Sequence, residues 1–156
     1  MAISPNTDFS AGAVLTSAQQ NKFPRGVVAY AVSTTSDTSI TTIELQLTAS
    51  TFTPVANRYY KITYYEPQLT TPATSGATIT AKIQPTSTSG TAIAQGQVQN
   101  SAAVATGYSL TTSCVTTFSA VSTVLIASLT SSTGTATATR SATAPAYILV
   151  EDIGPA

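Results

Sequence analysis

From Gly26 onward, apolar and polar residues alternate with a period of two along most of the sequence. Threonine supplies much of the polar half and makes up about a fifth of the 156 residues. Its β-branched side chain disfavours a helix and suits an extended strand that has one face in water. The pattern therefore predicts a chain built almost entirely from β-strands.

Eight segments of ordinary strand length follow this alternation: Val27–Val32, Ile43–Thr48, Tyr59–Tyr65, Thr78–Ile83, Thr91–Gln99, Tyr108–Phe118, Val121–Leu129 and Tyr147–Asp152. Within the fifth, Gly96 indicates a bulge or a close approach of the backbone. Turn-rich stretches separate the segments: Ser33–Ser39, Pro67–Gly76, Pro85–Gly90, Asn100–Gly107 and Ser131–Pro145. Within the low-complexity stretch Thr130–Thr143, a loop and an edge strand are both compatible with the pattern.

Many short strands with such spacing favour a sandwich or a barrel over a parallel sheet. Eight antiparallel strands divide evenly into two four-stranded sheets, so we predict an all-β, antiparallel β-sandwich of jelly-roll type. An immunoglobulin-like sandwich is the alternative, but the Cys, Trp, Cys pattern of that fold is missing.

The first 25 residues differ from the rest, and we predict an N-terminal arm over residues 1–25 and one sandwich domain over 26–156. Leu15–Lys22 is the one convincing helical segment, with Thr16 or Ser17 as its N-cap. A helix of about two turns is too short to be stable unless it docks on another surface.

The composition argues against an enzyme. Only 8% of the residues are charged, and the sequence has no His, no Trp and a single cysteine, Cys114. Serine is abundant, but G-x-S-x-G and S-x-x-K motifs are absent, and no His exists to activate a nucleophile. Cys114 is interpreted as a small buried hydrophobe. We therefore predict no catalytic residues.

The acidic residues are too scattered to predict a metal site, and no motif indicates a cofactor. Glu151 and Asp152 adjoin, but neighbours on a strand point to opposite faces, so they do not form an acid–base pair. We expect them to solvate a strand end or to pair with a base such as Arg140. A net charge of zero argues against binding to nucleic acid.

The N-terminus lacks the basic and apolar regions of a secretory signal. No apolar stretch approaches the length that spans a bilayer, so no membrane contact is expected. The sequence predicts a protein made in a cytoplasm.

Four tyrosines lie within the segment RYYKITYYE, two on each strand face. We expect one pair to enter the core and the other, around Lys61, to stay outside. Cross-strand packing is the plainest interpretation of the outer pair. A subunit interface comes next and a carbohydrate platform last.

The arm also carries apolar and basic side chains, which could pack on its own domain or reach a neighbouring protein. Arg25 and Arg58 could form charge-assisted bonds to a partner, although a solvated role is more common. The candidate interface residues are Phe9, Leu15, Phe23, Pro24, Arg25, Tyr59 and Tyr65.

Three segments, AGAVLTSAQQNKFPRGVVAY, RYYKITYYEP and AYILVEDIGPA, resemble small Thr- and Ser-rich virion proteins of tailed bacteriophages. The L-T-x-A-Q-x-N element and the terminal V-E-D-I-G-P carry the likeness. It implies a virion structural role, often as a trimer with a jelly-roll-like body, and it leaves the position on the virion open.

One compact domain with a short arm, and no shaft or repeats, favours a capsid decoration (cement) protein among these. The expected partners are the major capsid protein and further copies of the chain in a homotrimer, on the capsid exterior. The alternative is a receptor- or glycan-binding module of a tail or head fibre. Its site would combine Tyr59–Tyr65 with the stretches Pro67–Gly76 and Asn100–Gly107.

Overall fold

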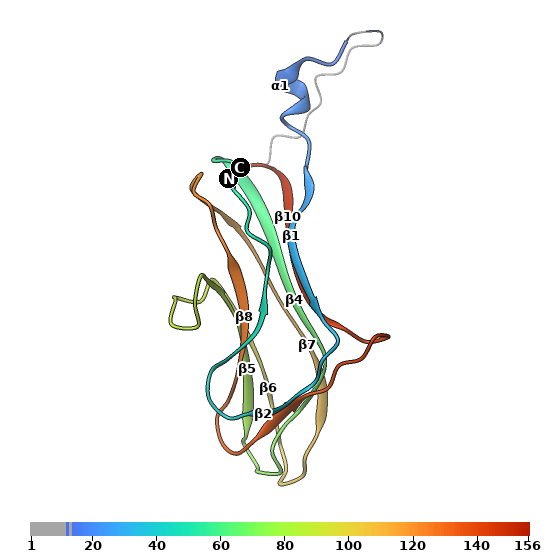
Figure 1. Ribbon diagram of the computed structural model, residues 1–156, viewed down its shortest axis with the longest axis vertical. Coiled ribbons are helices and arrows are strands. Elements are labelled where there is room, and N and C mark those ends of the chain that lie inside the picture. The colour runs from blue at the N-terminus through green and yellow to red at the C-terminus, as the bar shows by residue number, and fades with distance from the viewer. Residues whose placement is uncertain (1–11, 13) are drawn as a thin grey trace.

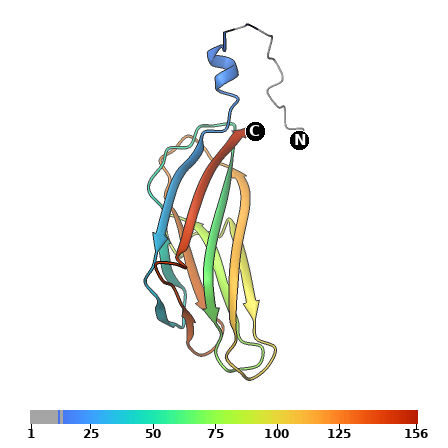
Figure 2. The same ribbon diagram turned by 90° about the vertical axis from the view of Figure 1, so that its right-hand side faces the viewer.

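The computed structural model describes residue 12 and residues 14–156. Two antiparallel sheets pack face to face in an elongated sandwich, and one short helix stands off its end (Figures 1 and 2). The predicted all-β, antiparallel sandwich is confirmed. The elements are α1 (Ser17–Gln20), β1 (Gly26–Ser33), β2 (Asp37–Ile40), β3 (Glu44–Thr48), β4 (Arg58–Thr70), β5 (Thr78–Pro85), β6 (Ala94–Gln99), β7 (Gly107–Thr117), β8 (Leu125–Ser131), β9 (Ala136–Ala138) and β10 (Ala146–Pro155).

The strands connect as a jelly roll. The first sheet places β1, β10, β4 and β7 side by side, with β9 and β2 continuing beside the far part of β4. The second sheet has the order β3-β8-β5-β6. When β2 and β9 are left out and the remaining eight strands are renumbered in chain order, the sheets read 1-8-3-6 and 2-7-4-5. This is the double Greek key of the jelly roll.

The core lies between the sheets and follows the predicted period of two. Along β4 the buried residues are Tyr60, Ile62 and Tyr64, whereas the residues between them are half-buried or exposed. Phe52 and Phe118 close the arm end of the core, with ring centroids 5.9 and 5.6 Å from Tyr60. Such tilted and edge-on contacts are the favoured geometry of aromatic rings.

The structure differs from several expected segment bounds. β2 lies partly within Ser33–Ser39, which was expected to be a turn, β8 begins at Leu125 and not at Val121, and α1 spans four residues where about two turns were expected. The stretch Pro67–Gly76 was expected to be a turn, but β4 continues to Thr70 through a register shift between Glu66 and Leu69. A bulge tolerates a proline, which has no N–H to donate to the ladder. The stretch Thr130–Thr143 resolves into the end of β8, a turn and the short strand β9.

The helix α1 forms as its capping signal predicts. The Gln19 N–H donates to Thr16 Oγ1 at 3.2 Å, and the Thr16 N–H donates to Gln19 Oε1 at 2.9 Å. This reciprocal pair is a capping box. No residue of α1 is buried, and the helix stands clear of the sandwich (Figure 2). Within the described residues, α1 is therefore not packed into the core of the sandwich.

Candidate interaction surface

The two tyrosine pairs of β4 separate as expected, and the structure shows which pair enters the core. Tyr60 and Tyr64 are each 1% exposed, and Tyr59 and Tyr65 point to the opposite side of the sheet. The Val55 N–H donates to the Tyr60 hydroxyl at 2.8 Å, and the Tyr64 hydroxyl donates to Glu66. The inner hydroxyls are therefore satisfied, and Tyr59 and Tyr65 remain the candidates for contact with another molecule.

The outer face of β1, β10, β4 and β7 looks toward the viewer in Figure 2. Pairing across these strands aligns its side chains in rows, of which three are Val27, Glu151, Lys61 and Val115; Tyr30, Leu149, Thr63 and Ser113; and Val32, Tyr147, Tyr65 and Thr111. Six apolar or aromatic side chains lie together on the three strands at one side, and we call them the outer patch: Val27, Tyr30, Val32, Tyr65, Tyr147 and Leu149.

The outer patch is unusually open to solvent for its composition. Tyr30 is 61% exposed, and Val27 and Val32 are each 54% exposed. Tyr65 and Tyr147 stack with ring centroids 5.3 Å apart. Contiguous apolar surface of this kind marks interaction sites more often than isolated exposed residues do.

The outer face of the other sheet provides a contrast within the same molecule. Alternate positions on β5 and β6 place polar side chains there: Thr78, Thr80, Lys82, Gln95, Gln97 and Gln99. This second sheet also exposes Leu45 of β3, at 55%, but among the residues described it carries no cluster of valine and tyrosine like that of the first. The asymmetry therefore belongs to the outer patch and is not general to the fold.

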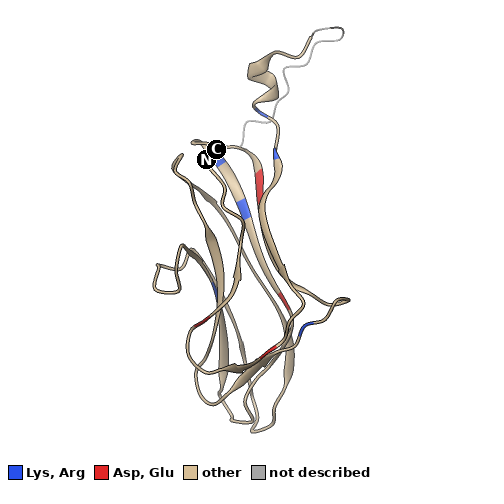
Figure 3. Cartoon of the chain, in the orientation of Figure 1, with Lys and Arg blue, Asp and Glu red and all other residues tan. Residues whose placement is uncertain are grey.

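Charge is sparse across the molecule (Figure 3). Four of the six basic residues belong to the arm or to the start of β4: Lys22, Arg25, Arg58 and Lys61. The last two pair with Asp152 and Glu151 of β10. Lys61 and Glu151 form an exposed pair at 4.0 Å on the outer face. Such surface pairs contribute at most about 1 kcal/mol to stability.

Arg58 ties the arm to the sandwich. Its Nε and Nη2 donate to the two carboxylate oxygens of Asp152 at 2.6 and 2.7 Å, and both side chains are buried. Its Nη1 and Nη2 also donate to the carbonyl oxygens of Asn21 and Phe23, each at 2.6 Å. Because Arg58 is 4% exposed, the expectation that it pairs with another protein is wrong. It fixes the base of the arm to β4 and β10.

The other arm candidates lie outside the sandwich core. Leu15 and Phe23 are 41% and 38% exposed, and Pro24 and Arg25 are exposed. Phe9 lies outside the described residues. The structure therefore separates the predicted interface residues into a group at the arm and a pair, Tyr59 and Tyr65, on the sheet.

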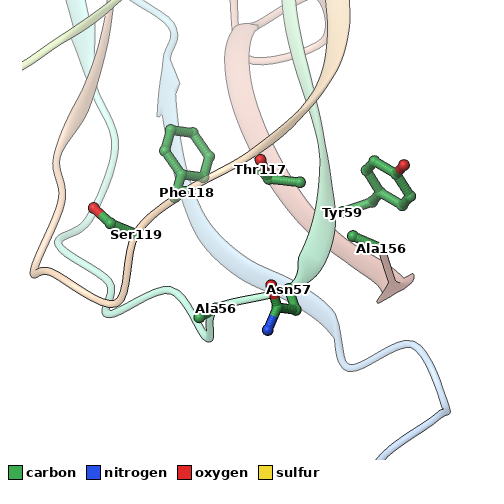
Figure 4. A pocket seen from close by; sticks show the side chains of 7 residues that line it. All are labelled: Ala56, Asn57, Tyr59, Thr117, Phe118, Ser119 and Ala156. Atoms are coloured by element: carbon green, nitrogen blue, oxygen red, sulfur yellow. The ribbon is translucent and has the colours of Figure 1, made fainter.

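Two open hollows lie at the arm end. The larger, about 570 Å³, is lined by Tyr59, Phe118 and the turns beside them, and none of its lining residues is charged (Figure 4). The smaller, about 280 Å³, lies beside Arg25 and Arg58 at the base of the arm. Neither holds a nucleophile beside a base, so both suit contact with a side chain of a partner better than chemistry.

A second buried ion pair joins the two sheets. Arg140 Nε and Nη2 donate to the Glu66 carboxylate at 3.0 and 2.5 Å, and Nη2 also donates to Gln46 Oε1 of β3 at 2.5 Å. The expected pairing of Arg140 with Glu151 or Asp152 is wrong, because those acids pair with Lys61 and Arg58.

Burial, together with the charge of Glu66, holds the pKa of Tyr64 well above its ordinary value. The Arg140 and Glu66 side chains are 3% and 0% exposed, which leaves them no access to a substrate.

The remaining reactive groups support no chemical site. Cys114 is half-buried against the core, and burial raises the pKa of its thiol. Within residues 12 and 14–156, no three His, Cys, Asp or Glu side chains are placed to hold a metal ion. The same part of the chain contains no helix with the length and apolar character needed to cross a membrane.

Two of the three parts of the expected glycan site come together, and the third part runs away from them along β4. The stretches Pro67–Gly76 and Asn100–Gly107 meet at the tip opposite the arm, where the buried Asn100 Nδ2 donates to the carbonyls of Pro72 and Val104 at 3.0 and 2.6 Å. Tyr59 is the second residue of β4, near the other end and roughly 35 Å from Thr70 at about 3.3 Å per residue. The loops form one surface and the outer tyrosines form another.

No protein-family model matches the sequence, and no curated protein matches it. Among solved structures, the chain is similar to one from Bacillus endospore appendages, described as a novel family of disulfide-linked pili. The two share 11% identity over 75% of this chain and 92% of the other, with a TM-score of 0.27. A likeness this weak supports no conclusion about function.

Proposed function

We propose that this protein is a phage virion structural protein and, in particular, a capsid decoration protein that acts as a homotrimer bound to the major capsid protein on the capsid exterior. The role requires surface area and a firm attachment, and it requires no reactive groups. Its strongest support is the buried clamp of Arg58, which holds a projecting arm rigidly at one end of the sandwich.

The arrangement of the arm end is consistent with docking. The described part of the arm, the C-terminal residue and both hollows lie at this end (Figure 1). The arm presents Leu15 and Phe23 as apolar anchors beside the exposed Arg25. A capsid surface that covered them would bury apolar area and supply the support that α1 lacks in isolation.

Binding to purified expanded capsids tests the proposal. We expect the full-length protein to co-sediment with capsids and a variant lacking residues 1–25 to bind at least tenfold more weakly. A Leu15→Ser/Phe23→Ser variant should weaken binding in the same direction, and Gln97→Ser, on the polar outer face at a distance from the arm, serves as the control. Equal binding by the full-length and truncated proteins would refute the role of the arm, and no binding by the full-length protein would refute the capsid assignment.

A receptor- or glycan-binding module of a tail or head fibre is the second candidate. It is favoured by one observation, the joined loops at the tip opposite the arm, which the buried Asn100 holds in place. A glycan array tests it. Hits that are lost with Ser101→Ala/Val104→Ala, but kept with Tyr59→Ala, would favour the tip. An array without hits would count against this function.

A further inference from the structure

Three residues of the outer patch, Val27, Tyr30 and Val32, are more than half exposed within the part of the chain that the structure describes. The outer patch lies on the middle and one edge of a four-stranded surface, whereas β5 and β6 on the opposite outer face present mainly threonine, lysine and glutamine, and Leu45 of β3 is exposed beside them. A cluster of six valine, tyrosine and leucine side chains on one face is more than solubility alone would favour.

We propose that the outer patch is the surface through which copies of this chain pack on one another. The inference rests on the self-association included in the proposed function, and it specifies which face carries that contact. Its occupant is the same face of another copy.

The area of the face is sufficient for such a contact. Four strands spaced about 4.8 Å apart span about 19 Å, and eight residues along β4 at about 3.4 Å per residue span about 27 Å. The face therefore covers on the order of 500 Å², and packing two such faces buries about 1,000 Å² in total. That value meets the lower limit for a specific interface, and tyrosine is among the residues that dominate such interfaces.

The width of the sheet also permits three-fold closure. Packed sheets lie about 10 Å apart, so each sheet stands about 5 Å from the middle of its interface. If three copies place these faces around a three-fold axis, the faces form an equilateral triangle with sides of about 19 Å, and each face lies about 5.5 Å from the axis. This distance is close to the roughly 5 Å that separates a packed sheet from the middle of its interface. With the axis along the strands, all the arms project from one end, as joint docking on a capsid would require.

The charges on the face are compatible with this packing. Lys61 and Glu151 lie on the two central strands at the same level, and their separation of 4.0 Å leaves both able to reach a partner. Every copy brings one charge of each sign to that level, so neighbouring copies complement each other. Opposite charges at a fixed height favour one register over slipped alternatives.

Molar mass in solution tests the inference. We expect light scattering at about 50 μM to give two or three times the 15.9 kDa of one chain. Val32→Lys and Tyr30→Lys, at positions already exposed, should reduce the mass to that of one chain, while the matched controls Thr80→Lys and Gln97→Lys on the polar face should leave it unchanged. A mass of two chains would show that the oligomer is a dimer and not a trimer, and it would support the outer patch as the contact surface. A monomeric wild type, or patch variants that associate as well as the controls, would overturn it.

A second measurement does not depend on the variants folding. A zero-length carbodiimide cross-linker applied to a mixture of ¹⁵N-labelled and unlabelled wild-type protein should join Lys61 of one copy to Glu151 of another. Only mixed-isotope peptides count, because the same pair also lies within one chain. Their absence in an oligomeric sample would place the contact elsewhere and overturn the inference. Capsid co-sedimentation, measured in parallel, reports on the proposed function separately.

Discussion

The buried clamp at the base of the arm makes a specific prediction for Arg58→Met. Methionine has a similar length but no charge, so the variant leaves the carboxylate of Asp152 buried without its partner. It also removes the donors that hold the carbonyls of Asn21 and Phe23. Breaking a buried ion pair by removing one member costs about 3–5 kcal/mol. For a chain of this size each kcal/mol lowers Tm by about 2–4 °C, so we expect a loss of about 10 °C.

Urea unfolding followed by circular dichroism measures the loss, and a second variant identifies its cause. Replacing Asp152 by Asn in the Arg58→Met background removes the stranded charge and retains an acceptor for the Gly154 N–H. We expect the double variant to be more stable than Arg58→Met alone by about 1 kcal/mol or more. Lys61→Met, which breaks the exposed pair with Glu151, is the control and should cost less than about 1 kcal/mol.

Limited proteolysis reports on the arm itself. Trypsin sites follow Lys22 and Arg25, on either side of the carbonyl that Arg58 holds at Phe23. We expect cleavage at these sites to be several-fold faster in Arg58→Met than in Lys61→Met. If Arg58→Met is within about 1 kcal/mol of the wild type and its arm is cleaved no faster, Arg58 does not act as a clamp.

Four further predictions concern the interior and its titratable groups. The buried Thr112 hydroxyl has no hydrogen-bond partner in the described structure, so Thr112→Val should stabilise the protein by about 1 kcal/mol in urea unfolding. Gly96→Ala should destabilise the protein by about 1–3 kcal/mol in the same assay, because the new Cβ would lie 2.6 Å from Thr112 Oγ1. Burial alone would raise the pKa of Asp37, but hydrogen bonds from Gln46 and Ser39 and the charge of Arg140 outweigh it and lower the pKa below 3.8. The ionised Asp37 therefore stabilises the fold above pH 3.8, and this contribution is lost as the pH falls through the lowered pKa. Asp37→Asn should flatten the acid limb of a curve of unfolding free energy against pH. Burial raises the pKa of Cys114 above 9.0, so its reaction with a disulfide reagent at pH 8 should be at least about tenfold slower in the native protein than in urea, and equal rates would contradict its packing against the core.

The sequence predicted the features that depend on neighbouring residues. Alternation and short apolar runs identified the eight long strands, and Thr16, one of the two N-caps expected for the helix, is confirmed by the capping box. Gly96 was interpreted as a close approach, and its backbone does lie against Thr112 of β7. Each of these signals is local, because strand pleating and helix capping are set within a few residues.

What the sequence could not predict depends on residues far apart. The partners in the two buried ion pairs are separated by 94 and 74 positions, and no local pattern distinguishes Asp152 from Glu66 as the acid for Arg58. The strands β2 and β9 have four and three residues and lack a clear alternation, so only their pairing reveals them. The outer patch depends on register, since its rows form only once β1 and β10 align.

The place of β10 in the first sheet has a consequence for biosynthesis. It lies between β1 and β4, so β1 acquires its sheet partner only when Ala146–Pro155 are available. Ser33 pairs with Ala146, which leaves the ribosome 113 residues later. A nascent chain that ended before β10 would expose the edges of two strands and an open core, which favours aggregation. The sandwich is therefore expected to complete its fold only after residue 155 has left the ribosome, and nascent chains are expected to depend on chaperones until then.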